Sequence, residues 1–260
     1  MGLYPTPLSS LLLLLFLQTL LAPVVMSNSR TTRPITTGTS VLGLKYRDGV
    51  MLAADTLCSY GSLAKYKDAR RLVSIGDASS NCLIGGGGEF SDFQFIVELL
   101  QKNALEDQMS GEPTESSAKA VWSYLRAVMY QRRNKMNPLW NDLLVAGYDK
   151  EEEKAFLGTV DKIGTAFEDD VLATGFGSYL CLPIMREKWR PDLEEGEARA
   201  LLEDCLRVLF YRDCRALNRV QIAKATADGV LVSEPYEIET SWDSAAFVAT
   251  KGGLEGDGGW

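Results

Sequence analysis

The sequence predicts one α/β domain in which β-sheets are covered by helices. Hydrophobic patterning alternates along the chain as strands, two helices, strands, two helices and strands. The 260 residues suffice for one sizeable domain with a buried core, and no internal repeat or linker divides them. An apolar content of 46% and a charged content of 24% are ordinary for a globular protein.

The first two strands are expected as a hairpin over residues 39–46 and 50–55. They flank Asp48-Gly49, which is a strong short-range turn signal between alternating apolar residues. Two further short strands are expected over residues 72–75 and 81–84.

The four consecutive glycines 85–88 are expected to interrupt this strand pattern. A phosphate-binding loop is disfavoured because the G-K-[ST] ending is missing and Glu89 and Asp92 would repel an anion. We therefore expect a backbone role, in which only glycine fits the local geometry or lets another chain segment approach.

Apolar residues at helical spacing predict four helices, and the remaining apolar runs predict four more strands. The last two strands are expected to pair across Asp228-Gly229. The predicted helices cover residues 90–105, 117–132, 179–189 and 195–214, and the predicted strands cover residues 143–147, 155–160, 220–225 and 230–233.

Composition excludes several classes of function. The chain contains no histidine, which removes Ser-His-Asp triads, Cys-His pairs and His-ligated zinc. The formal net charge of −8 gives no basic surface for nucleic acid. The five cysteines form no C-x-x-C pair, so we expect reduced structural thiols, no metal site and no cofactor. These are Cys58, Cys82, Cys181, Cys205 and Cys214.

The two ends of the chain differ from its body. Residues 1–30 form a leader whose apolar run, residues 10–21, is shorter than the ~20 residues that span a bilayer. Three interpretations stay open for it: a removable pro-segment, a secretory signal, or a misassigned start. Residues 236–260 form a C-terminal tail, and its last stretch, residues 252–260, is too rich in glycine and acids to order itself without a partner.

One motif carries a family resemblance. The pattern Thr-x3-Gly-x-Lys-x4-Val-x2-Ala-Ala-Asp, which runs from Thr39 to Asp55, resembles the β-type subunits of the 20S proteasome. The likeness continues through residues 60–64, 132–141, 172–177 and 209–213, and it covers residues 31–245. It implies an N-terminal nucleophile hydrolase fold, a four-layer αββα sandwich, over residues 31–235. The stretch Lys-Met-Asn-Pro-Leu-Trp-Asn at 135–141 is similar to a non-catalytic member of this family.

The resemblance assigns positions for the threonine mechanism, in which a free α-amine with a pKa near ~8 is the base. The nucleophile position is Thr39, the first carboxylate is Asp55 and the later aspartate is Asp213. The position of the lysine that assists the amine is Arg71. Arginine stays protonated at any relevant pH, so it can pair with a carboxylate but cannot relay a proton. We expect Asp55, Arg71 and Asp213 to persist as a buried charge cluster.

Two further features indicate an inactive site. The hydroxyl groups that the family uses to bond the amine and orient water are replaced by Phe176 and Ala216. The resemblance also places the propeptide cleavage ahead of the nucleophile, at the Arg30–Thr31 bond. Thr39 would then carry an amide nitrogen in place of a free amine, and no catalytic residue is expected.

The sequence thus predicts a structural subunit of the β-ring, located in the cytoplasm and nucleus. Its expected partners are the neighbouring β subunits, the α-ring and the opposite β-ring, reached by the tail, with no nucleic acid and no membrane. Two alternatives remain. One is an active threonine peptidase with Thr39 as its N-terminal nucleophile, and the other is a secreted globular protein of unrelated class.

Overall fold

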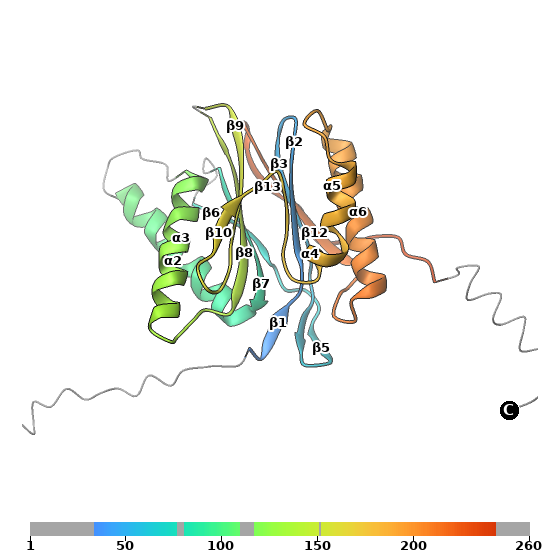
Figure 1. The fold of residues 1–260 in the computed structure, drawn as a ribbon, viewed down its shortest axis with the longest axis horizontal. Coiled ribbons are helices and arrows are strands. Elements are labelled where there is room, and N and C mark those ends of the chain that lie inside the picture. The colour runs from blue at the N-terminus through green and yellow to red at the C-terminus, as the bar shows by residue number, and fades with distance from the viewer. Residues whose placement is uncertain (1–33, 77–80, 110–116, 151, 243–260) are drawn as a thin grey trace, which may run out of the picture. The chain divides into compact units, whose positions relative to one another are not determined.

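A computed structural model describes residues 34–76, 81–109, 117–150 and 152–242. Two antiparallel sheets pack face to face, and helices cover the outer face of each (Figure 1). The predicted four-layer αββα sandwich is therefore confirmed. The leader, the Arg30–Thr31 bond and the tail beyond Trp242 lie outside the described residues.

The larger sheet has eight strands in the order β10-β9-β8-β7-β1-β4-β5, with β6 paired to β7. The smaller sheet has six strands in the order β11-β2-β3-β12-β13, with β14 paired to β12. The strands of the larger sheet are β1 (Thr36–Gly38), β4 (Cys58–Tyr60), β5 (Leu63–Tyr66), β6 (Leu72–Ile75), β7 (Cys82–Glu89), β8 (Asn141–Asp149), β9 (Lys154–Val160) and β10 (Ala166–Glu168). Those of the smaller sheet are β2 (Val41–Tyr46), β3 (Gly49–Asp55), β11 (Val171–Ala173), β12 (Arg219–Thr226), β13 (Gly229–Val232) and β14 (Tyr236–Glu237).

Helices α2 (Phe90–Met109) and α3 (Ala118–Asn134) cover the larger sheet, and α4 (Gly177–Leu180), α5 (Leu182–Lys188) and α6 (Glu195–Arg212) cover the smaller one. The Ser117 hydroxyl caps α3 by accepting a hydrogen bond from the amide of Ala120 at 3.2 Å. A capping box between Glu194 and Glu197 starts α6. Local sequence signals therefore fix where two of the longest helices begin.

Three apolar clusters fill the sandwich, one between the sheets and one under each helical layer. Leu52, Leu83 and Leu144 belong to the central cluster and are fully buried. All five cysteines are free thiols, of which only Cys214 is exposed. Burial raises the pKa of the Cys58 thiol to about 11 and that of Cys82 to about 12, so these thiols stay protonated and act as packing groups.

The expectation that glycines 85–88 interrupt the strand pattern is wrong, because β7 runs through all four. A Cβ on Gly86 would lie 2.2 Å from the Phe93 ring, and one on Gly87 would lie 2.6 Å from the carbonyl oxygen of Thr39. Gly88 has φ +92° and faces the carbonyl oxygen of Trp140. Each glycine lets another segment approach the strand, which is the backbone role that the sequence suggested.

The single helix expected over residues 179–189 is two helices, α4 and α5, divided at Cys181. Pro183 lies in the first turn of α5 and has no N–H to donate to a preceding carbonyl, so α4 cannot continue unbroken. The sequence also missed β1, β4, β5, β10, β11 and β14, which have two to four residues each. Runs this short carry too few residues for a period-2 pattern.

Candidate functional site

Thr39 and Asp55 meet at the open end of the first hairpin. The β2–β3 register pairs Val41 with Ala54, which brings the residues just beyond this pair together. The Thr39 hydroxyl donates to Asp55 Oδ1 at 3.2 Å. The other carboxylate oxygen, Oδ2, accepts from the amide of Leu217 at 3.0 Å. Both oxygens of Asp55 are therefore held by the protein itself.

Arg71, directly before β6, is the largest charged side chain at this site and is 1% exposed. Its Nε donates to the carbonyl oxygen of Asp55 at 3.1 Å, and Nη2 forms an ion pair with Asp55 Oδ1. The remaining donations go to three other carbonyl oxygens: Nη1 to Thr39 at 3.0 Å and Gly86 at 3.4 Å, and Nη2 to Ser40 at 3.2 Å. A guanidinium has five N–H groups, so every donor of Arg71 has an acceptor.

The electrostatics of the Asp55–Arg71 ion pair favour a fixed structural contact. Burial raises the pKa of the Asp55 carboxyl, while Arg71, the Leu217 amide and the Thr39 hydroxyl all act in the opposite direction. This arrangement ties both sheets together, because Asp55 ends β3 and Gly86 lies in β7. The Arg71 guanidinium therefore holds the Asp55 end of β3 against β7 and does not serve as a proton relay.

Asp213 is buried at the end of α6, but no hydrogen bond or ion pair among the described residues joins it to Asp55 or Arg71. Its Oδ1 accepts from the amide of Arg215 at 2.9 Å, while its Oδ2 has no partner in the described part of the chain. The segment after Asp213 instead contributes the Leu217 amide to Asp55. The structure thus brings Thr39, Asp55 and Arg71 together and leaves Asp213 outside their hydrogen-bonded set.

The two positions that lack the family's hydroxyl groups are Phe176 and Ala216, one exposed and one packed against apolar residues. Phe176 is 59% exposed and follows Gly175, whose φ is +57°. Ala216 packs partly buried against the core under α4, α5 and α6. The nearby hydroxyl that sequence reasoning missed is Ser40, whose Oγ accepts from the amide of Gly177 at 2.8 Å. It joins the start of α4 to the hairpin, so its role is structural.

The segment ahead of Thr39 forms part of the larger sheet. Strand β1 pairs with β4 on one side and with β7 on the other, both antiparallel. The buried carboxylate of Glu89 accepts from the amides of Ile35 and Thr36, the latter at 3.0 Å. A Cβ on Gly38 would lie 2.5 Å from Cδ of Arg71, so the backbone rests directly on that side chain. Thr39 therefore directly follows a strand that is paired on both sides.

Nothing in the described ranges suggests a metal centre or a membrane span. No group of three or more cysteine, aspartate or glutamate side chains there is placed to hold a metal ion. No helix in these ranges is both long and apolar enough to cross a membrane.

Comparison with known proteins gives a consistent result. A family model described as "Proteasome subunit" matches residues 35–225. A relative in Arabidopsis thaliana, named proteasome subunit beta type-4, is 45% identical over 88% of this chain and 91% of its own length. The Xenopus laevis protein of the same name is 41% identical over 84% of this chain and 89% of its own. Proteasome subunit beta type-7 of Saccharomyces cerevisiae is 36% identical over 83% of this chain and 84% of its own length.

Proposed function

The chain belongs to the proteasome subunit family, and on that premise we propose that it is a structural, non-catalytic subunit in the β-ring of the 20S proteasome core. Its relatives are named as β-type subunits, and the similarity covers most of their length. In this role the chain completes the ring that encloses proteolysis and leaves peptide hydrolysis to other subunits.

One observation carries the non-catalytic part of the proposal: all five N–H groups of Arg71 are engaged by Thr39, Ser40, Asp55 and Gly86. The threonine mechanism uses the residue's own free α-amine as the base and a neighbouring lysine, a compact amine, to assist it. A guanidinium does not lose its proton in that range, and this one is fully hydrogen-bonded.

Strand β1 supports the same conclusion. Cleavage between Gly38 and Thr39 would cut a chain that is paired on both sides in the middle of an eight-stranded sheet. Without that cleavage Thr39 has no free α-amine to accept the proton of its hydroxyl. Residues 36–38 also fill the gap between β4 and β7, where an extended peptide would otherwise pair.

The partners follow from the architectural role: neighbouring β subunits, the α-ring and the opposite β-ring. The start of the tail supports its use as an arm, because it is fastened to the domain up to Trp242. β14 pairs with β12, Ile238 is buried, and the Trp242 ring contacts Phe210 and Tyr211 edge-on.

We propose that the chain is located, as part of the particle, in the cytoplasm and nucleus.

Thr39→Ala tests the proposal in particles assembled with the full subunit set. We expect every peptidase activity of the particle to be unchanged, while the fold loses one hydrogen bond to Asp55, about 1 kcal/mol. The matched control is the threonine-to-alanine change in a catalytic subunit, which should abolish one activity.

One observation favours the rival function, an active threonine peptidase: the Thr39 hydroxyl donates a hydrogen bond to Asp55. Loss of an activity in Thr39→Ala would establish that rival.

A further inference from the structure

Within the described residues, strand β5 pairs with β4 alone and forms an edge of the larger sheet. It stands last in the strand order, and all four of its residues are exposed. Leu63 is 61% exposed and Tyr66 is 50% exposed, while Tyr60 on β4 is exposed beside them. Such an edge presents free backbone N–H and C=O groups that can pair with a strand of another chain. Exposed apolar side chains on this edge make such pairing favourable.

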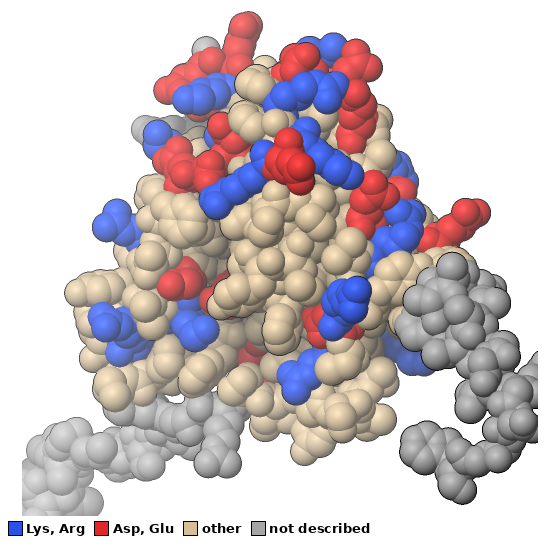
Figure 2. Space-filling model, turned by 45° about the vertical axis from the view of Figure 1, so that its right-hand side comes forward, with Lys and Arg blue, Asp and Glu red and all other residues tan. Residues whose placement is uncertain are grey.

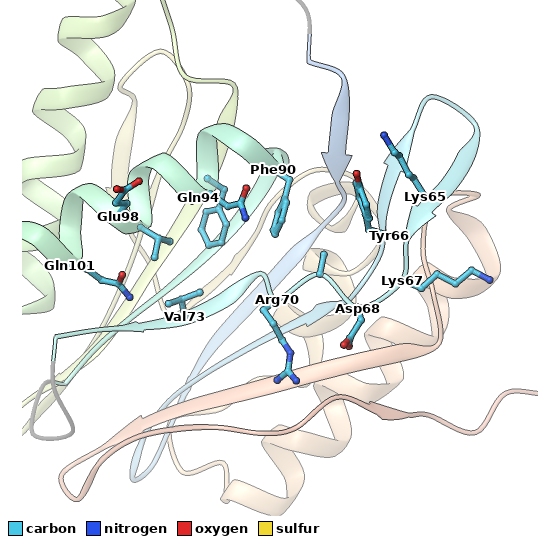
Figure 3. Close-up of a pocket in the computed structure, with 13 residues that line it drawn as sticks. Lys65, Tyr66, Lys67, Asp68, Arg70, Val73, Phe90, Gln94, Glu98 and Gln101 are labelled. Carbon is cyan, nitrogen blue, oxygen red and sulfur yellow. The ribbon is translucent and has the colours of Figure 1, made fainter.

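A groove with a volume of about 700 Å³ lies between the β4–β5 hairpin and helix α2. We call it the β5 groove. Figure 3 shows its two walls, one formed by α2 with Phe90, Gln94 and Glu98 and the other by Lys65 and Tyr66. Its apolar lining accepts a hydrophobic side chain, while the rim near β5 is basic. An extended segment that pairs with β5 would place its side chains at this groove.

The rim of the groove near β5 is complementary to an acidic ligand, whereas Glu98 on the α2 wall is itself acidic. Arg70 and Asp68 each have an ion-pair partner, Glu234 and Arg219 respectively. Lys65 and Lys67 have no carboxylate partner among the described residues, and the ammonium group of Lys65 lies over the rings of Tyr60 and Tyr66 at 5.3 and 5.1 Å. In Figure 2 charged side chains of both signs crowd the upper end of the molecule, while the lower end is mostly uncharged. The hairpin therefore offers two uncompensated cations on a chain whose net charge is −8.

These charges distinguish between possible occupants. Residues 1–33 contain no acid and carry Arg30 and Arg33, so the leader does not match the lysines. A second copy paired edge to edge about β5 would bring Lys65 and Lys67 against their own copies, which like charges disfavour. A neighbour that presents carboxylates together with an apolar side chain matches both the rim and the groove.

We propose that β5 and the β5 groove form the docking site for an extended, acidic and apolar segment of an adjacent β-type subunit. This inference rests on the proposed function, because it needs a ring neighbour. The segment adds a strand at β5, inserts an apolar side chain into the groove and directs its carboxylates to Lys65 and Lys67.

The test uses whole particles assembled from the complete subunit set, with the photo-crosslinking residue benzoylphenylalanine at position 63. Irradiation should join it to one β-type subunit, at a segment that contains Asp or Glu. Lys65→Glu with Lys67→Glu should lower the crosslink about tenfold through like-charge repulsion. The control, Lys150→Glu with Lys154→Glu, makes the same change in charge at the exposed β8–β9 turn, at the opposite end of the molecule from β5 (Figure 1), and should leave the crosslink within about twofold.

The outcomes separate the two proposals. A wild-type chain that never enters the particle contradicts the proposed function itself. A chain that enters normally but crosslinks to an α-type subunit or to its own leader overturns the docking site alone, as does a crosslink that the charge reversal leaves unchanged. If the reversed variant keeps the wild-type circular dichroism spectrum yet fails to enter while its control enters, the docking site is supported. Lysine in place of an Asp or Glu in the crosslinked segment of the partner should then restore entry.

Discussion

Arg71→Lys is expected to lower the free energy of unfolding by about 3 kcal/mol, without conferring any peptidase activity. Lysine offers three N–H donors on one nitrogen, whereas the site presents four carbonyl oxygens and one carboxylate oxygen arranged around a planar fork. Some of these buried acceptors must lose their partner, and each such loss costs roughly 1–3 kcal/mol. Arg71→Met should be worse, because it leaves Asp55 buried without its ion pair.

Urea denaturation of the purified chain, together with its yield in assembled particles, measures this effect. The matched control is Arg47→Lys, an exposed arginine that pairs with Asp48 and Glu194. That change should alter stability by no more than about 0.5 kcal/mol. Wild-type stability for Arg71→Lys would show that the hydrogen bonds of the guanidinium are not needed. A new peptidase activity in this variant would show that only the missing lysine keeps the site inactive.

Gly88→Ala should destabilise the chain by about 3 kcal/mol or more. The new Cβ would lie 2.0 Å from the carbonyl oxygen of Trp140, and the φ of +92° is unfavourable for alanine. The Trp140 backbone, directly before β8, cannot rotate away as a side chain would, so the neighbouring strand must shift. Gly88 also pairs with Gly38, and a shift at Gly88 therefore reaches β1 and the backbone in front of Thr39.

Gly196→Ala is the matched control for this prediction. It makes the same chemical change in the first turn of α6, where a Cβ meets no atom within 4 Å. We expect a neutral effect or a gain of up to about 1 kcal/mol, since alanine is the better helix former. Thermal unfolding of both variants measures the contrast. Equal melting temperatures would mean that β7 tolerates a side chain at this position, contrary to the packing seen here.

The sequence predicted the elements whose signals are local. Asp48-Gly49 defines the first hairpin with its register, and helical spacing identifies α2, α3 and α6 within a few residues. It could not predict β1, because three residues without alternation acquire their strand conformation from β4 and β7 on either side. The glycine run was misread for a related reason: the atoms that exclude side chains there belong to Thr39, Phe93 and Trp140, which are distant in sequence or on another element.

The residues of the candidate site also differ in whether the sequence could predict them. Thr39, Asp55 and Arg71 could be selected through the family resemblance, and the structure places them in contact. The carbonyl acceptors of Arg71 could not be found from sequence, because carbonyl groups belong to every residue and only the fold directs them. The same holds for the Leu217 amide, which donates to Asp55, whereas Asp213, expected in the same cluster, does not contact it.

The central claim is that Thr39 has neither a free amine nor a competent neighbouring base. A peptide epoxyketone bonds to both the hydroxyl and the α-amine of an N-terminal threonine, so treatment of the assembled particle followed by peptide mass analysis of each subunit tests this claim directly. We predict adducts on the catalytic subunits and none on residue 39, with a mature N-terminus upstream of Ile35. An adduct on Thr39, or a chain that begins at Thr39, would contradict the account.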